Sequence, residues 1–114
     1  MSFNVGDEFR GLPRFSIEAA QAVVDEALKL ANVRAFRNNR GIGFEPNFVF
    51  IEYLHERAPG GVGLSFYGGP ERHHNSLILT GRTDSYSRAI VRSQAELQSV
   101  LPHVCKAYGF KFGR

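Results

Sequence analysis

The spacing of apolar residues along this chain changes from a helical to an extended period near residue 33. Within residues 16–31, apolar side chains recur three and four positions apart, which is the spacing of one face of an amphipathic helix. Ser16 is predicted to cap this helix, because its hydroxyl can accept hydrogen bonds from the free amides of the first turn. From Val33 onward the period becomes two, which is typical of strands with one buried face.

Residues 33–92 alternate strand-like runs with short turns rich in Gly, Pro and Asn. The strand-like runs are 33–37, 42–45, 48–54, 62–67, 77–80 and 86–91. Consecutive strands that are joined by short turns run antiparallel, so we expect an antiparallel meander of about five strands. The longest connection in it is the loop 68–75.

A second helix is predicted at 93–109. Ser93 and Glu96 have the spacing of a capping box, in which the hydroxyl and the carboxylate satisfy free backbone amides of the first turn. Pro102 is expected to kink the helix because proline has no amide hydrogen. Gly109 suits the C-terminal cap.

These elements define an α+β fold in which two terminal helices pack on one side of an antiparallel sheet. The 114 residues fit a single domain, with an irregular arm at 1–14, a helix at 16–31, the sheet at 33–92 and a helix at 93–109. The expected core residues are Ile17, Val24, Leu28, Phe48, Phe50, Leu64, Phe66, Leu97, Leu101 and Val104.

The composition limits the cellular compartments in which the protein is expected. Cys105 is the single cysteine, which excludes an internal disulfide and fits a reducing compartment. The N-terminus has no basic start followed by an apolar run, so no signal peptide is expected. The longest apolar stretch, 48–51, is far shorter than a membrane span. We expect a soluble, cytoplasmic protein without a membrane partner.

The C-terminal part carries the pattern Val91-Arg92-Ser93, Glu96-Leu97, Val100-Leu101-Pro102, Val104 and Ala107-Tyr108. Together with the strands at 48–54 and 62–67, it resembles a small bacterial domain of unknown function. That domain is often labelled a predicted transport protein and is sometimes joined to restriction-type endonucleases. The resemblance covers residues 44–108, although the turn 58–61 lacks the lysines usual in the domain. It implies a fold and an accessory role beside endonucleases, and it implies no catalytic residues.

The sequence contains no constellation that indicates catalysis or a bound cofactor. His103 and Cys105 lie two positions apart on a helix, about 200° around its axis, so they cannot both face one metal ion. Cys105 is expected to be a half-buried filler, because the dipole near the end of a helix disfavours a thiolate. We predict no catalytic residue, no metal and no cofactor. The loop 68–75, with His73 and His74, is the one candidate for a small-ligand or enzyme site.

Arginine and aromatic residues favour a binding function. Arginine supplies 11 of the 14 basic residues, and guanidinium groups contact phosphates in a bidentate manner and stack on aromatic rings. In the last strand, Tyr86 and Arg88 alternate with Ala89 and its neighbours. If helices cover the Ala89 face, a basic and aromatic face stays open, as in proteins that bind single-stranded nucleic acid. The candidate contacts are Arg34, Arg37, Arg40, Tyr86, Arg88 and Arg92.

The same residues are compatible with a structural role and with a protein partner. Arginine is also enriched by a GC-rich bacterial genome, and arginine stems cover apolar surface on a solvated sheet face. Exposed aromatic residues such as Phe44, Tyr67 and Phe112 would suit a homodimer or a protein–protein interaction domain, and the arginines would suit an acidic protein partner. The favoured hypothesis is a non-enzymatic accessory or binding module whose partner is nucleic acid.

Overall fold

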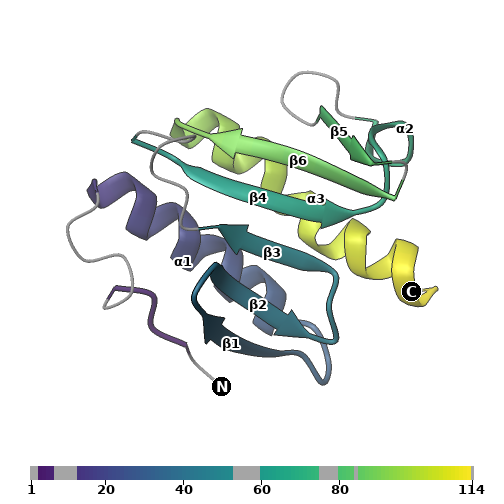
Figure 1. Ribbon diagram of the computed structural model, residues 1–114, viewed down its shortest axis with the longest axis horizontal. Coiled ribbons are helices and arrows are strands. Elements are labelled where there is room, and N and C mark those ends of the chain that lie inside the picture. The colour runs from purple at the N-terminus through teal and green to yellow at the C-terminus, as the bar shows by residue number, and fades with distance from the viewer. Residues whose placement is uncertain (1–2, 7–12, 53–59, 75–79, 84, 114) are drawn as a thin grey trace.

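The computed structural model describes residues 3–6, 13–52, 60–74, 80–83 and 85–113. Their helices and strands are arranged as Figure 1 shows. In chain order the elements are α1 (Arg14–Leu28), β1 (Arg34–Asn38), β2 (Gly41–Glu45), β3 (Val49–Glu52), β4 (Val62–Tyr67), α2 (Pro70–His73), β5 (Thr80–Thr83), β6 (Tyr86–Val91) and α3 (Gln94–Phe112). The expected α+β class, with a helix at each end of an antiparallel sheet, is confirmed.

Six strands within the described residues form one antiparallel sheet in the order β1-β2-β3-β4-β6-β5. The first four strands follow the predicted meander, but β6 pairs with β4 and leaves β5 at the edge. The alternating side chains of β6 explain this order, because Ala89 and Val91 are fully buried and belong in an inner strand. Part of the strand expected at 77–80 lies outside the described residues, and β5 begins at its last residue.

Both long helices lie on the same face of the sheet, behind it in the view of Figure 1. The apolar core fills the space between these two layers. Six of the expected core residues are buried there: Val24, Phe48, Leu64, Phe66, Leu97 and Val104. Ile17, Leu28 and Leu101 are partly buried against the same cluster.

Phe50 was wrongly predicted to belong to this core. Val49 and Ile51 of β3 are buried under the helices, so the strand period turns the side chain between them to the opposite face. Phe48 is also buried, although it has the same parity as Phe50, because it precedes the first residue of β3 and is not bound by the alternation.

The start of α1 differs from its prediction. The helix begins at Arg14 after Pro13, and Ser16 is not its cap. The Ser16 side chain is instead buried, and its Oγ donates a hydrogen bond of 2.7 Å to the carbonyl of Gly61. This hydroxyl therefore joins the helix to the segment that enters β4, a contact between residues 45 positions apart.

The Ser93 cap of α3 is confirmed, whereas the Glu96 carboxylate bonds one residue before the position that a capping box predicts, and the helix is longer than predicted. The Ser93 hydroxyl accepts from the amide of Glu96, and the Glu96 carboxylate accepts from the amide of Arg92. The helix continues through Pro102 and past Gly109 to Phe112, where Gly113 ends it in the left-handed conformation. Aromatic packing in the last turns, such as that of Phe112 on Tyr108 at 4.8 Å, outweighs the helix-breaking tendency of Gly109.

Candidate binding face of the sheet

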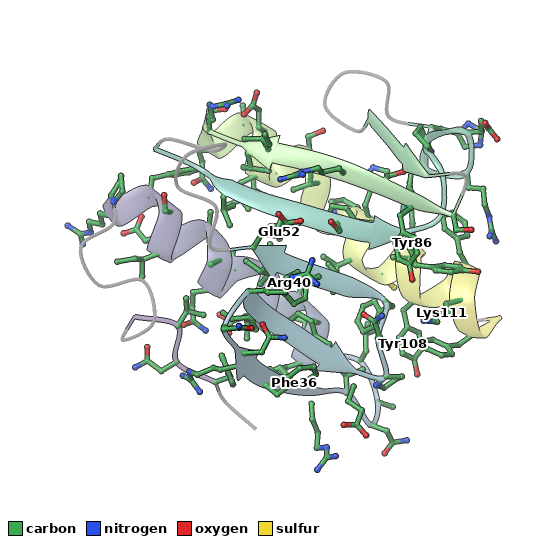
Figure 2. All side chains as sticks on the ribbon, in the orientation of Figure 1. Phe36, Arg40, Glu52, Tyr86, Tyr108 and Lys111 are labelled. Atoms are coloured by element: carbon green, nitrogen blue, oxygen red, sulfur yellow. The ribbon has the colours of Figure 1, made fainter. Side chains whose placement is uncertain are left out.

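The face of the sheet turned away from α1 and α3, called here the open face, carries the candidate site. In β6, Ser87, Ala89 and Val91 are buried while the residues between them stay half-buried. This division of the strand is the predicted one. Residues paired across neighbouring strands share a face, so the register assigns Phe50, Ser65 and Arg88 to one row across β3, β4 and β6. Figure 2 shows the labelled side chains of this face, among them Phe36 and Glu52, in front of the ribbon.

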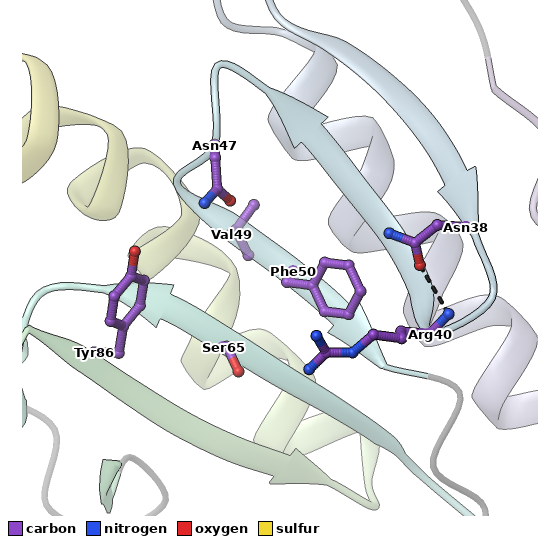
Figure 3. Close-up of a pocket in the computed structure, with 7 residues that line it drawn as sticks. All are labelled: Asn38, Arg40, Asn47, Val49, Phe50, Ser65 and Tyr86. Carbon is purple, nitrogen blue, oxygen red and sulfur yellow. Dashed lines mark hydrogen bonds between the residues drawn. The ribbon is translucent and has the colours of Figure 1, made fainter. Parts of the chain in front are cut away.

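A hollow of about 440 Å³ lies on this face between the β1–β2 turn and β6. Figure 3 shows the Phe50 ring in its middle, Arg40 beside that ring and Tyr86 at the other end. Two amides and two hydroxyls line it. The lining residues are Asn38, Arg40, Asn47, Val49, Phe50, Ser65 and Tyr86. Arg40 is the one charged side chain among these described lining residues, and none of them is acidic.

The Asn38 side chain holds the turn that presents Arg40. Its Oδ1 accepts hydrogen bonds from the amides of Arg40 at 2.8 Å and Gly41 at 3.0 Å, which is the local pattern that asparagine favours in tight turns. A side chain at Gly41 would collide with the carbonyl oxygen of Ile51 on β3, so only glycine lets the turn lie this close to the sheet. The Arg40 side chain is exposed at the tip of the turn, and no carboxylate among the described residues pairs with it.

Arg88 lies on the open face as predicted, but it is held by an acidic partner. Its guanidinium donates to the Glu52 carboxylate at 3.1 Å, and the two side chains are only 17% and 9% exposed. The Ser65 hydroxyl donates to the other Glu52 oxygen at 3.4 Å. This pair lies largely buried in the middle of the sheet, where its charges largely cancel.

The remaining predicted arginines do not converge on the hollow. Arg34 lies 3.6 Å from the Glu45 carboxylate on the neighbouring strand, and both side chains are exposed. Arg37 alternates to the other face, where it stacks on Phe3 at 4.0 Å. Arg92 follows β6 and is exposed at the start of α3.

Of the six predicted contacts, the structure therefore brings Arg40 and Tyr86 together. Sequence reasoning missed Asn38 and Asn47, and it placed Phe50 in the core. Phe36, an aromatic residue among the arginines of the first hairpin, is 43% exposed and is the one large apolar side chain on the surface of the described part. The signal was present in the sequence: Asn-Asn-Arg-Gly marks a two-residue hairpin, and the strand period around Phe50 gives its face.

The two histidines of the loop 68–75 point in different directions. His73 ends α2 and is buried, and its Nδ1 lies 2.8 Å from Nδ1 of His103 on α3. The carbonyl of Tyr67 lies 2.8 Å from the other ring nitrogen, and because a carbonyl only accepts, His73 carries its proton on Nε2. Its Nδ1 then accepts from His103. His74 is exposed in the left-handed conformation after α2. His73 is thus a core residue, without a surface for a ligand.

Burial sets the protonation of this histidine pair. It lowers the pKa of His73, while the hydrogen bond to Tyr67 opposes this shift and the charges of Lys106 and Arg72 add to it. Burial is also the main cause that lowers the pKa of His103 to about 4, with smaller contributions from His73 and Lys106. Both rings are therefore neutral at pH 7.

The described residues offer no group of three or more potential metal ligands. His103 is buried and Cys105 is exposed, so these two side chains diverge as their spacing predicted. The expectation of a half-buried Cys105 was wrong, because this position faces away from the sheet.

Among the described helices, none combines the length and apolarity that a membrane crossing requires.

No family model, curated protein or solved structure matches this chain.

Phe44, which was expected to be an exposed aromatic residue for self-association, is 1% exposed and belongs to the core. The candidate site therefore stands on the open face and on the hollow within it.

Proposed function

We propose that this protein is a non-enzymatic module that binds single-stranded nucleic acid on the open face of its sheet. The observation that carries the proposal is the hollow, where Arg40 lies beside Phe50 and Tyr86 lies at the other end, without an acidic residue in the described lining. Proteins that bind single strands combine aromatic side chains, on which bases stack, with cations that contact the backbone.

Aromatic side chains extend across the open face beyond the hollow. Phe36 on β1 is the most exposed, and its ring covers Gly43 of the next strand. At the other end, Tyr67 and Tyr86 meet edge to face with ring centres 5.6 Å apart. A strand that crosses the sheet would meet aromatic rings on β1, β3, β4 and β6. Stacking of this kind requires unpaired bases, so duplex should bind more weakly than single strands.

The charges on this face leave it attractive to phosphate. Glu52 and Glu45, which lie on it, face Arg88 and Arg34 respectively. Arg40 has no such carboxylate among the described residues, and the whole chain carries a formal charge of +3. An accessory role in nucleic-acid binding also fits the resemblance to a domain that is sometimes joined to endonucleases.

Fluorescence anisotropy with labelled single-stranded and duplex oligonucleotides at several salt concentrations tests the proposal. We expect micromolar or tighter binding of single strands that weakens as salt rises. Arg40→Ala should weaken it and reduce the slope of log affinity against log salt by about 0.7, the value for one phosphate contact to a single strand. Arg14→Ala removes the same charge from an exposed position on α1 and should change neither. Absence of binding at low salt would refute the proposal.

Self-association is a second candidate, favoured by one observation. Phe36 is exposed on β1, which is an edge strand of the sheet, and edge strands with apolar side chains are prone to pair with other chains. A dimeric mass by light scattering that becomes monomeric in Phe36→Lys, without affinity for oligonucleotides, would favour this candidate over the first.

A further inference from the structure

On one part of the hollow, the polar groups left for a ligand can only donate hydrogen bonds. Asn38 Oδ1 already accepts two backbone hydrogen bonds, so its Nδ2 group is the part of the amide that is left for a ligand, and it can only donate. The Arg40 guanidinium also only donates. Figure 3 shows both side chains next to the Phe50 ring, with Asn38 to its right and the Arg40 guanidinium below it. A ligand on that ring therefore meets two donors from the β1–β2 turn.

The bases differ in what they would present to these donors. Guanine has two adjacent acceptors, O6 and N7, on one edge. Adenine places the N6 donor beside its N7 acceptor, and cytosine presents the N4 donor. A donor of the base that is turned toward Asn38 and Arg40 would leave polar groups without partners, which costs affinity. Guanine thus satisfies both donors from a single edge.

The opposite end of the hollow complements the remaining edge of guanine. Asn47, Ser65 and Tyr86 carry an amide oxygen or a hydroxyl that can accept from N1–H and the N2 amine. We infer that the hollow holds one unpaired guanine, stacked on Phe50 and read at O6 and N7 by Asn38 and Arg40. This inference rests on the proposed binding of single strands and adds a base preference to it.

Anisotropy titrations with a nine-residue oligothymidylate that carries one central substitution test the inference. A single guanine should raise affinity by about fivefold or more over thymine, the range expected when one base edge is read by two donors. Inosine keeps O6 and N7 but lacks the N2 amine, so it should retain most of this gain. In 7-deazaguanine N7 is replaced by carbon, and the gain should be lost. One guanine per strand also avoids four-stranded guanine assemblies.

Asn38→Asp is the decisive variant. Aspartate keeps the acceptor that holds the turn but replaces the Nδ2 donor with an acceptor, so the ratio of guanine to thymine affinity should fall to about one. Asn39→Asp makes the same charge change at the next residue, which is exposed and is not part of the hollow's lining, and should preserve the ratio.

The outcomes separate the inference from the proposal on which it rests. Equal affinity for all central bases, with binding of the parent oligothymidylate retained, overturns the guanine preference alone. A preference for guanine that survives both 7-deazaguanine and Asn38→Asp also overturns it, because the edge and the donor would then be irrelevant. Failure of every oligonucleotide to bind overturns the proposed function itself.

Discussion

At the scale of single residues, the pair formed by Glu52 and Arg88 shows how a buried partner changes the availability of a charged side chain for binding. An arginine on a half-open strand face is available to phosphate only if no nearer anion holds it. Here the carboxylate lies at 3.1 Å and is 9% exposed. Removing one partner of such a pair leaves the other charge poorly solvated, which costs more than the pair itself contributes.

Arg88→Met should therefore destabilise the fold by about 3 kcal/mol, because Glu52 would lose its partner while staying buried. Arg34→Met is the matched control, since it breaks a pair whose side chains are 67% and 69% exposed, and such pairs contribute less than about 1 kcal/mol. The free energy of unfolding from urea denaturation measures both. Equal losses in the two variants would contradict a structural role for the Glu52–Arg88 pair.

The buried histidine pair predicts a stability that depends on pH. Because the pKa of His103 is lowered to about 4 from its ordinary value near 6.5, the unfolded chain binds a proton more readily than the folded protein does. Stability is therefore complete above pH 6.5 and falls as the pH drops toward 4. The loss from this residue amounts to about 3 kcal/mol between pH 7.5 and 4. The lowered pKa of His73 acts in the same direction.

Urea denaturation at a series of pH values tests this prediction. His103→Gln removes the titrating ring but keeps an amide donor for His73, so the fall in stability between pH 6.5 and 4 should become smaller. His74→Gln removes an exposed histidine and should leave the pH profile of the parent unchanged. A parent profile that is flat over this range would show that the pair is not neutral in the folded state.

At the scale of elements, the β1–β2 hairpin links the fold to the candidate site. The turn presents Arg40 and Asn38, and its position against β3 depends on the close approach of Gly41 to the backbone of Ile51. A Cβ atom added at Gly41 meets backbone, which cannot move without disturbing the sheet. A Cβ atom added at Gly43 meets an exposed side chain, which can rotate away.

Gly41→Ala should destabilise the protein by about 2 to 3 kcal/mol and weaken single-strand binding, because the added methyl group pushes the hairpin away from β3. Gly43→Ala meets the end of the exposed Phe36 ring at 2.6 Å, and this ring can turn aside, so its cost should be smaller. Thermal or urea denaturation combined with anisotropy measures both effects. A larger loss in Gly43→Ala would contradict this view of the hairpin.

At the scale of the whole molecule, the two layers give the protein two surfaces with different roles. The helices cover one face of the sheet, as Figure 1 shows. The candidate site occupies the other face. Cys105 is exposed on α3, so it marks the helical surface. The exposed Phe36 marks the open face.

A bulky maleimide attached to Cys105 should leave the affinity for single strands unchanged, because the label lies on the helical surface. The same label on Phe36→Cys, in a Cys105→Ser background, should weaken binding by tenfold or more relative to the unlabelled variant. Anisotropy before and after labelling measures this contrast. Strong inhibition from the Cys105 label would place the binding surface on the helices.

Much of the local structure was predictable because it depends on neighbours in sequence. The Ser93 cap, the division of residues 86–91 into two faces, and the antiparallel course of the first four strands follow from the geometry of helices, strands and short turns. These features need no knowledge of distant partners.

The candidate site was predicted in part. Arg40 and Tyr86 were named, but the residues that surround them were not. Asn38 acts through a local turn that the sequence signals, so its role was within reach. That Tyr86 joins it at one hollow depends on the pairing of β4 with β6, which no local pattern specifies.

The sequence by itself determined the periods, the caps, the turns and the two faces of each strand, because the backbone imposes these over a few residues. Only the tertiary structure decided that β6 lies inside β5, that Glu52 neutralises Arg88, and that His73 meets His103. It also decided that Ser16 bonds to Gly61 instead of capping its own helix. Each of these contacts joins residues far apart in the chain, and their partners are selected by how the layers pack and which polar groups are buried together.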